Sequence, residues 1–185
     1  MSDMNRLTVI AGPTAVGKGT VIRRILETHP EIKLSVSATT RAPRPGEEDG
    51  VAYHFLSMQE FDSKIAAGQM LEYAVVHGTN KYGTLREPVE AALAAGQKLI
   101  LEIDIQGARQ VKQAMPEANL IFIAPPSWQD LVSRLSGRGT ETAEEQARRL
   151  ATARQELEAQ SEFDHVVIND EVAECALQVV NLIQA

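Results

Sequence analysis

Short apolar runs alternate with helix-like segments along the chain, and this alternation limits the fold more than any other feature. The runs are LTVIA (7–11), KLSVSA (33–38), KLILEI (98–103), NLIFIA (119–124) and DHVVI (164–168). Continuously apolar strands that are separated by helices form parallel sheets, which helices cover on both sides. The sequence therefore predicts an α/β fold whose core is a five-stranded parallel sheet with helices on both faces.

The helices between these runs carry recognisable start and stop signals. Ser57 with Glu60 and Thr142 with Glu145 have the spacing of capping boxes, in which each residue's side chain satisfies the other's backbone N–H group. Gly68 and Gly96 stand where two of the helices should end. These local signals agree with the predicted alternation.

Two stretches interrupt the alternation. Residues 39–87 contain a charged loop rich in proline and glycine and then strand-like runs, which predicts an inserted β-rich lobe. Residues 128–158 are charged and predominantly helical in pattern, which predicts a helical lid. We expect one domain, 1–185, with a core at 1–38, 88–127 and 159–185, over which the two insertions close on ligands.

Charge and cysteine content restrict the partners and the location. The net charge of −7 argues against a nucleic-acid partner, because such proteins usually carry a basic excess. No apolar run approaches the length of a membrane span, and the start MSDMNRLTVIAGP lacks a secretory signal pattern. The single cysteine, Cys175, lies in a helical pattern and is expected to be a buried, inert thiol. We expect a cytoplasmic protein without a membrane partner; the sequence does not indicate an oligomeric state.

A glycine-rich segment directly follows the first apolar run and leads into a helix. It reads Gly12, Pro13, Thr14, Ala15, Val16, Gly17, Lys18, Gly19 and Thr20. Glycines let successive backbone N–H groups point at phosphate oxygens, the helix adds its positive end, and Lys18 adds a mobile charge. The segment predicts a cradle for a nucleoside triphosphate.

The segment departs from the usual phosphate-loop pattern at one position. Gly19 stands where a serine or threonine hydroxyl usually binds Mg²⁺, and Thr20 comes one residue later. The protein ligands of the ion are therefore unknown, and we expect phosphates and water to hold most of it. The departure disfavours motors, GTPases and transport ATPases, but it leaves phosphoryl transfer possible because that reaction depends mainly on positioning and charge neutralisation.

Further motifs along almost the whole chain resemble those of guanylate kinases. They are the segment 37–47 (SATTRAPRPGE) with Asp49, Gly50, Tyr53, His54 and Phe55; Glu72 in MLEYA; Tyr82, Gly83 and Thr84; the run 102–107 (EIDIQG); the run 137–140 (GRGT); and Asn169 with Asp170. The resemblance implies a P-loop nucleoside monophosphate kinase fold in which 39–87 is the GMP-binding lobe. It also implies transfer of the γ-phosphoryl group of ATP to GMP, and to dGMP, in purine nucleotide metabolism and GMP recycling.

The resemblance assigns four residues to the phosphate of GMP. Arg41 and Arg44 match arginines of the family that hold this phosphate, and two guanidinium groups can grip a dianion with paired hydrogen bonds. Tyr53 and Tyr82 match tyrosines whose hydroxyl groups donate to the same phosphate. From the sequence pattern alone, a solvated loop for the arginines and amphipathic packing for the tyrosines remain open.

Another group is assigned to the guanine base. Guanine presents N1–H and N2–H donors, so a selective pocket needs acceptors. Glu72 and Asp104 match the acidic pair that reads guanine in the family, with Ser37 and Thr84 as hydroxyl partners. Glu102 lies on the same face of its strand as Asp104 and is included in the GMP site. Three roles for its side chain remain open: it orients Lys18, it orders the water ligands of Mg²⁺, or it forms a structural ion pair. Many family members carry Asp at position 102.

The donor side includes residues outside the phosphate loop. The resemblance implies that Arg138 and Arg149 reach the transferred phosphoryl group, that Arg134 and Arg138 help to bind ATP, and that Asn169 contacts adenine. Together with Lys18 and Arg44, Arg138 and Arg149 form the expected catalytic set, since cations stabilise the charge on the transferring group.

A helix expected at 142–158 presents an apolar stripe. The stripe consists of Ala143, Ala147, Leu150, Ala151 and Leu157. Arg148 is expected to be a solvated charge near Glu144, and Arg154 a structural ion-pair partner. Trp128 is expected to pack at a helix start.

Two other functions remain as alternatives. A non-catalytic scaffold module resembling guanylate kinase would not need the retained Lys18, and a kinase for ribose bisphosphates would not need a base pocket. We therefore favour the ATP-dependent GMP kinase, with Mg²⁺ as cofactor and with ATP and GMP as its small-molecule partners.

Overall fold

The computed structural model describes residues 7–76, 79–136 and 142–185. Its larger sheet is parallel throughout, with the strand order β2-β7-β1-β8-β9. The strands are β1 (Leu7–Ala11), β2 (Ile32–Leu34), β7 (Lys98–Glu102), β8 (Asn119–Ala124) and β9 (His165–Ile168). The predicted five-stranded parallel core is therefore confirmed.

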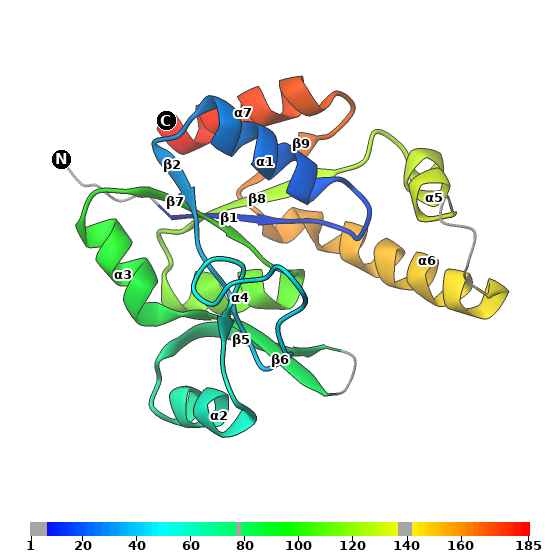
Figure 1. Ribbon diagram of the computed structural model, residues 1–185. Helices are drawn as coiled ribbons and strands as arrows, with labels where there is room; N and C mark the ends of the chain where they lie inside the picture. The colour runs from blue at the N-terminus through cyan, green and yellow to red at the C-terminus, as the bar shows by residue number, and fades with distance from the viewer. Residues whose placement is uncertain (1–6, 77–78, 137–141) are drawn as a thin grey trace.

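Helices cover both faces of this sheet (Figure 1). On one face lie α1 (Lys18–Thr28) and α7 (Val172–Gln184), whose apolar side chains pack against the isoleucines of the central strands. On the other face lie α3 (Arg86–Ala94) and α4 (Ile105–Ala114), packed against the leucines of β7 and β8. Because β1 and β8 are buried on both faces, their residues form the near-continuous apolar runs seen in the sequence.

A second sheet is built from the region predicted as an inserted lobe. Its strand order is β4-β3-β6-β5, and α2 (Met58–Ala66) packs beside it. The strands are β3 (Ala38–Thr39), β4 (His54–Phe55), β5 (Met70–Val76) and β6 (Asn80–Leu85). Figure 1 shows this sheet beyond α4, on the side of the core opposite to α1 and α7.

The strand expected at 33–38 is wrong in one respect, because the chain changes sheet within it. β2 ends at Leu34, and the Ser35 N–H group makes a last bond to the Ile100 carbonyl before the chain leaves the core. Ala38 then pairs with Gly83 in the second sheet. The apolar residues spaced through KLSVSA concealed this crossing, because the pattern does not reveal that Leu34 is exposed whereas Ala38 is buried.

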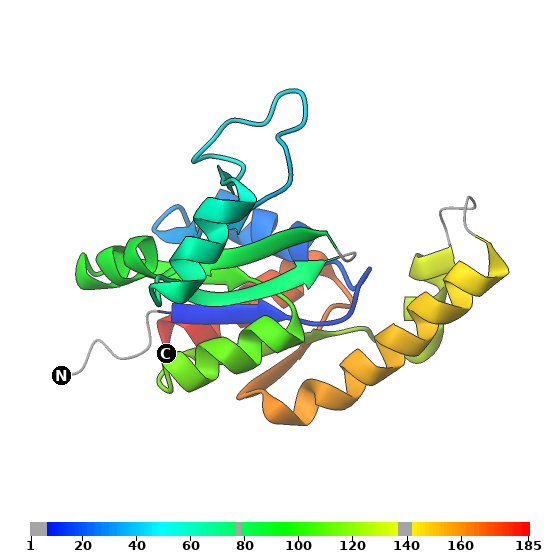
Figure 2. The ribbon, with the colours of Figure 1, turned by 90° about the horizontal axis from the view of Figure 1, so that it is seen from below.

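The region predicted as a lid contains α5 (Trp128–Ser136) and α6 (Ala143–Glu158), followed by a short 3₁₀ helix, Ala159–Glu162. Figure 2 shows α6 running outward from the core beside α5. The expected apolar stripe on α6 is partly wrong: Leu150, Ala153 and Leu157 pack against α5, whereas the alanines at 143, 147 and 151 are exposed. The contact follows an i, i+3, i+7 spacing that passes through Ala153.

Two expectations about α5 and α6 have different outcomes. Trp128 packs at the start of α5, as predicted. Within the described part of the chain, Arg154 forms no ion pair of the expected kind; its guanidinium group lies over the Trp128 ring, 4.7 Å from the centroid. This arrangement places a cation on an aromatic face.

Several local predictions are confirmed. Ser57 with Glu60 and Thr142 with Glu145 form complete capping boxes, and Gly68 and Gly96 follow the ends of α2 and α3 with positive φ. Cys175 is fully buried, and burial raises the pKa of its thiol to about 11, which keeps it protonated and unreactive. Among the described helices, none has both the length and the apolarity required to cross a membrane.

Candidate active site

The phosphate loop connects the end of β1 to the start of α1, at the carboxyl edge of the parallel sheet. Gly17, the residue before α1, has φ +93°, a conformation that side chains other than glycine rarely adopt. At Gly12 a β-carbon would lie only 2.3 Å from the Ile123 carbonyl oxygen. The two glycines therefore let the loop curl tightly against β8, as the motif predicts.

Lys18 is held across the mouth of this loop. Its Nζ donates to the carbonyl oxygens of Gly12, at 2.7 Å, and Pro13, at 3.1 Å. Burial lowers the pKa of Lys18, while the nearby carboxylates of Glu102, Glu156 and Asp104 oppose that shift. The ammonium group thus lies in a partly buried position among three acidic side chains.

Glu156, on α6, is a residue that our sequence analysis did not select. The backbone N–H group of Thr14 donates to its Oε2 across 3.3 Å, and burial raises the pKa of its carboxyl group. A charged residue on an amphipathic helix is usually solvated, so the sequence offered no signal for this contact. The carboxylate binds a loop N–H group of the kind that phosphates use.

Arg134 and Asn169 brace the phosphate loop from behind. The Asn169 Nδ2 group donates to the Val16 carbonyl at 2.8 Å, and its own N–H group donates to Ala124. Arg134 donates to the carbonyl oxygens of Val16, at 3.2 Å, and Asn169, at 3.3 Å. Asn169 is buried, and its Oδ1 has no hydrogen-bond partner among the described residues.

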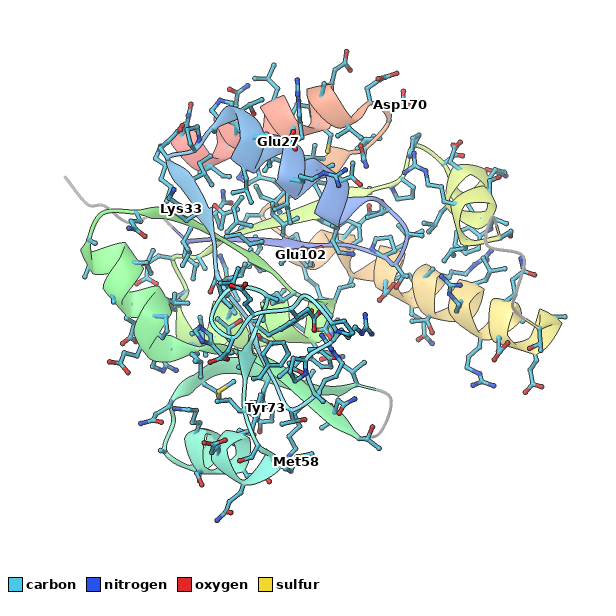
Figure 3. All side chains as sticks on the ribbon, viewed as in Figure 1. Glu27, Lys33, Met58, Tyr73, Glu102 and Asp170 are labelled. Carbon is cyan, nitrogen blue, oxygen red and sulfur yellow. The ribbon has the colours of Figure 1, made fainter. Side chains whose placement is uncertain are left out.

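A cavity of about 470 Å³ lies between the phosphate loop and the second sheet. Among its lining residues are Gly12, Thr14 and Lys18 from the phosphate loop, and Ser37, Tyr53, Glu72, Tyr82, Glu102, Asp104 and Glu156 from other elements. Figure 3 labels Glu102, one of these lining residues, near the centre of the molecule. The cavity thus brings together the phosphate loop and most of the residues assigned to the GMP site.

Glu72 is the buried carboxylate of this cavity, with 4% of its surface exposed. Its Oε1 accepts a 2.7 Å hydrogen bond from the Thr84 hydroxyl group. Burial raises the pKa of Glu72 to about 7; the Thr84 hydrogen bond opposes this shift and the charge of Asp104 adds to it. A buried acid with a single hydroxyl partner retains unused acceptor capacity, which a ligand can take up.

Asp104 lies at the start of α4 and has a structural task there. Its Oδ1 accepts the Gly107 N–H group at 2.7 Å and so caps the helix. Asp104 also lines the cavity that contains Glu72, and its charge acts on the Glu72 carboxyl group. The predicted acidic pair is therefore brought together in space.

Glu102 ends β7 close to the unusual residue of the phosphate loop. Its Oε1 lies 3.8 Å from the position that a β-carbon on Gly19 would occupy. A carboxylate oxygen thus stands beside the place where most phosphate loops carry a hydroxyl group, and this hard oxygen suits an ion such as Mg²⁺. The described residues contain no group of three His, Cys, Asp or Glu side chains arranged to hold a metal by themselves.

The residues assigned to the acceptor phosphate form an aromatic and basic cluster at the cavity rim. Tyr53 and Tyr82 line the cavity, with their ring centroids 6.0 Å apart. The guanidinium group of Arg41 lies over Tyr53, at 5.3 Å from its centroid, and pairs with Glu47 at 3.0 Å. Arg44 is exposed, and its backbone N–H group donates to the same Glu47 carboxylate at 2.7 Å.

Two of the other predicted arginines, Arg148 and Arg149, lie on α6. Arg149 is half-buried on this helix. Arg148 pairs with Glu144 at 3.5 Å, and both side chains are largely exposed, as predicted. Arg138, together with the rest of the GRGT motif, lies outside the described residues.

Comparisons with known proteins agree with this geometry. The family model for guanylate kinase matches residues 4–185. The chain is 61% identical to the guanylate kinase of Leifsonia xyli subsp. xyli over 176 residues, which is 95% of this chain and 69% of that protein. It is 57% identical to the guanylate kinase of Nocardia farcinica over 178 residues, or 96% of this chain and 92% of that protein. A crystal structure of guanylate kinase from Anaplasma phagocytophilum, 30% identical in sequence, matches with a TM-score of 0.76 and covers 100% of this chain and 87% of that one. The chain therefore belongs to the guanylate kinase family.

Proposed function

We propose that the phosphate loop holds ATP, that the cavity beside it holds GMP, and that the γ-phosphoryl group passes between them to give ADP and GDP. As a member of the guanylate kinase family, the chain is an ATP-dependent nucleoside monophosphate kinase. One observation carries the assignment of the two sites: a single cavity connects Lys18 of the phosphate loop to the buried Glu72.

On the donor side, the loop N–H groups and Lys18 bind the triphosphate. In the structure, Lys18 donates to two loop carbonyl oxygens, which are weaker partners than a phosphate. When ATP binds, the ammonium group can therefore exchange these hydrogen bonds for hydrogen bonds to the donor phosphates. Arg134 and Asn169 hold the Val16 carbonyl and so keep the loop in shape beneath the nucleotide. We also assign Asn169 to the adenine amino group, for which its buried Oδ1, without a hydrogen-bond partner among the described residues, would be the acceptor.

On the acceptor side, Glu72 and Asp104 accept the N1–H and N2–H groups of guanine, with Ser37 and Thr84 beside them. Adenine carries an acceptor at N1 and lacks the 2-amino group, so it would leave a buried carboxylate unpaired. Leaving a buried polar group without a partner is costly, and such sites discriminate strongly between ligands. The buried Glu72–Thr84 pair supports this role.

The phosphate of GMP is assigned to Arg41, Arg44, Tyr53 and Tyr82. In the structure, the Glu47 carboxylate pairs with Arg41, at the place that we assign to the GMP phosphate. We propose that the GMP phosphate displaces Glu47 from Arg41 and recruits Arg44 from solvent. The edge-to-face contact between the Tyr53 and Tyr82 rings supports this role by restricting the direction of their hydroxyl groups.

The chemistry requires no protein nucleophile. A phosphate oxygen of GMP attacks the γ-phosphorus in line with the departing ADP oxygen, while Lys18, Arg44, Arg138 and Arg149 neutralise the developing charge. Glu102, beside Gly19, would help to hold Mg²⁺, and the bound ion would supply further neutralisation of phosphate charge. Closure of the GMP-binding lobe (39–87) and the lid (128–158) over the core excludes water and limits hydrolysis. Cytoplasmic location, the requirement for Mg²⁺ and the use of dGMP remain predictions.

The direct test measures ADP release with ATP as donor and with GMP, dGMP, AMP, UMP and CMP as acceptors. We expect turnover with GMP and dGMP only, and loss of at least about a hundredfold in kcat for Lys18→Met. Turnover with AMP at a rate similar to GMP would contradict the base assignment. Absence of turnover with every acceptor, together with failure to bind ATP, would instead indicate a scaffold module. Activity on ribose bisphosphates would indicate a sugar kinase.

A further inference from the structure

Gly107 lies in the first turn of α4, where nothing in the backbone requires a glycine. It is buried, it belongs to the regular helix, and it is not among the glycines with positive φ. Glycine is among the least favourable residues within a helix because it loses the most conformational freedom on folding. Its presence therefore needs another physical reason.

That reason is space for the acidic pair of the cavity. A β-carbon on Gly107 would lie 2.7 Å from Oε2 of Glu72 and 3.2 Å from Oδ1 of Asp104. The first distance is shorter than real β-carbon contacts allow, and the second is tight. Gly107 thus lies between two carboxylates, and its own N–H group donates to one of them, Asp104, at 2.7 Å.

The helix cannot easily move away to make room for a larger residue. One turn after Gly107, the Gln110 side chain accepts from the Tyr73 N–H group at 3.1 Å and donates to the Tyr73 carbonyl at 2.9 Å. These two bonds fix α4 against β5 next to Glu72; Tyr73 is labelled on this strand in Figure 3. The part that yields to an added methyl group is therefore the flexible end of the Glu72 side chain.

We propose that Gly107 is a positioning residue for acceptor selection: it leaves the space in which the Glu72 carboxylate lies and orients Asp104 through its N–H group. This proposal rests on the role of Glu72 in reading guanine. Alanine at 107 would favour the helix, but it would displace the carboxylate that we assign to GMP. The substitution should therefore impair the use of GMP.

The first test compares Gly107→Ala with Gln106→Ala, an exposed neighbour in the same turn. We expect Gly107→Ala to lower kcat/KM for GMP by at least about tenfold, mainly through KM, with the KM for ATP changed by less than about twofold. Gln106→Ala should leave all these quantities near wild type. Loss of ATP and GMP use in equal measure would overturn the proposal.

A double-mutant cycle with Glu72→Ala identifies the cause. If Gly107 acts by making room for Glu72, adding Gly107→Ala to Glu72→Ala should change kcat/KM for GMP by less than about twofold. A further tenfold loss in the double variant would mean that the methyl group meets the nucleotide itself, and the proposal would fail. If Gly107→Ala does not fold but the double variant does, the clash is with Glu72 as proposed; if neither folds, the space argument is wrong.

The cycle also separates this inference from the proposed function. A Glu72→Ala variant that uses GMP as well as wild type would refute the guanine assignment and, with it, the role of Gly107. A damaged Glu72→Ala variant beside an unaffected Gly107→Ala variant would refute only the role of Gly107.

Discussion

The backbone N–H group of Thr14, in the phosphate loop, donates a hydrogen bond to the carboxylate of Glu156 on α6, across 3.3 Å. Glu156 also lines the cavity and acts electrostatically on Lys18. A carboxylate of the lid region thus occupies part of the surface that we assign to the donor phosphates. ATP must displace it, because the Thr14 N–H group has one hydrogen to donate and a phosphate beside the Glu156 carboxylate would be repelled by its charge.

We therefore expect Glu156→Gln to bind ATP more tightly than wild type in the absence of GMP. The gain should be about three- to fivefold, the size typical of one partly solvated charge interaction. Calorimetric titration with ATP measures it directly. Glu158→Gln, an exposed position two residues further along α6, is the matched control and should not change the affinity. Weaker ATP binding by Glu156→Gln would show that Glu156 supports the donor instead of competing with it.

The second prediction concerns the pH dependence of GMP use. Burial raises the pKa of Glu72 to about 7. In the proposed site, guanine would bind the ionised form of Glu72, whose two oxygens both accept hydrogen bonds. The ratio of kcat/KM for GMP between wild type and Glu72→Gln should therefore rise about tenfold from pH 6 to pH 8, as Glu72 loses its proton. Titration of the GMP phosphate affects kcat/KM of both proteins equally, so its effect cancels in this ratio. A ratio that is flat over this range would contradict the assigned role of the Glu72 charge.

The same shift predicts how the stability of the free protein depends on pH. The folded protein holds the Glu72 proton more tightly than the unfolded chain does, since the pKa rises from 4.5 to about 7. The favourable contribution is complete below pH 4.5 and is lost as pH rises through about 7. At about 1.4 kcal/mol per pH unit, the loss by pH 8 is at most roughly 3 kcal/mol.

Glu72→Gln should remove this dependence, because an amide does not titrate. Its free energy of unfolding relative to wild type should become more favourable as pH rises from 5 to 8, measured by urea denaturation at each pH. Glu60→Gln changes an exposed acid in the capping box of α2, whose pKa is lowered by Ser57, and serves as the control. The control should show no gain in this range, and a Glu72→Gln curve parallel to wild type would mean that Glu72 is ionised in the fold throughout.

The sequence predicted the parts of the fold that depend on local pattern. β1 and β8 could be identified from composition alone because they are buried on both faces and form unbroken apolar runs. The crossing between sheets at Ser35–Ser37 could not, since hydrogen bonds to a distant strand decide where β2 stops. Likewise, the buried face of α6 depends on where α5 lies, which no periodicity within α6 specifies.

The candidate site divides in a similar way. The motifs named Glu72 and Asp104, and the structure brings them to one cavity. The contacts of Glu156 with Thr14 and of Gly107 with Glu72 join segments far apart in the sequence; Glu156 belongs to no motif, and the EIDIQG run that contains Gly107 does not reveal what the glycine makes room for. Such residues emerge only when the chain is folded, because their role depends on the space around them.

The last prediction concerns Asn169, which holds the Val16 carbonyl from a buried position behind the phosphate loop. Among the described side chains, Asn169→Ala leaves that carbonyl with Arg134 as its remaining partner, and it removes the support beneath Gly17, whose backbone lies against the Asn169 amide. We expect a loss of roughly 1–3 kcal/mol in unfolding free energy, as for other buried hydrogen bonds, and ATP affinity weaker by about tenfold.

GMP affinity, measured without ATP, should change by less than about twofold, because Asn169 is not among the residues that line the GMP cavity. Asn181→Ala, exposed on α7, controls for removal of an amide. Equal losses of ATP and GMP affinity would mean that Asn169 supports the whole fold, and its assignment to the donor site would then have to be withdrawn.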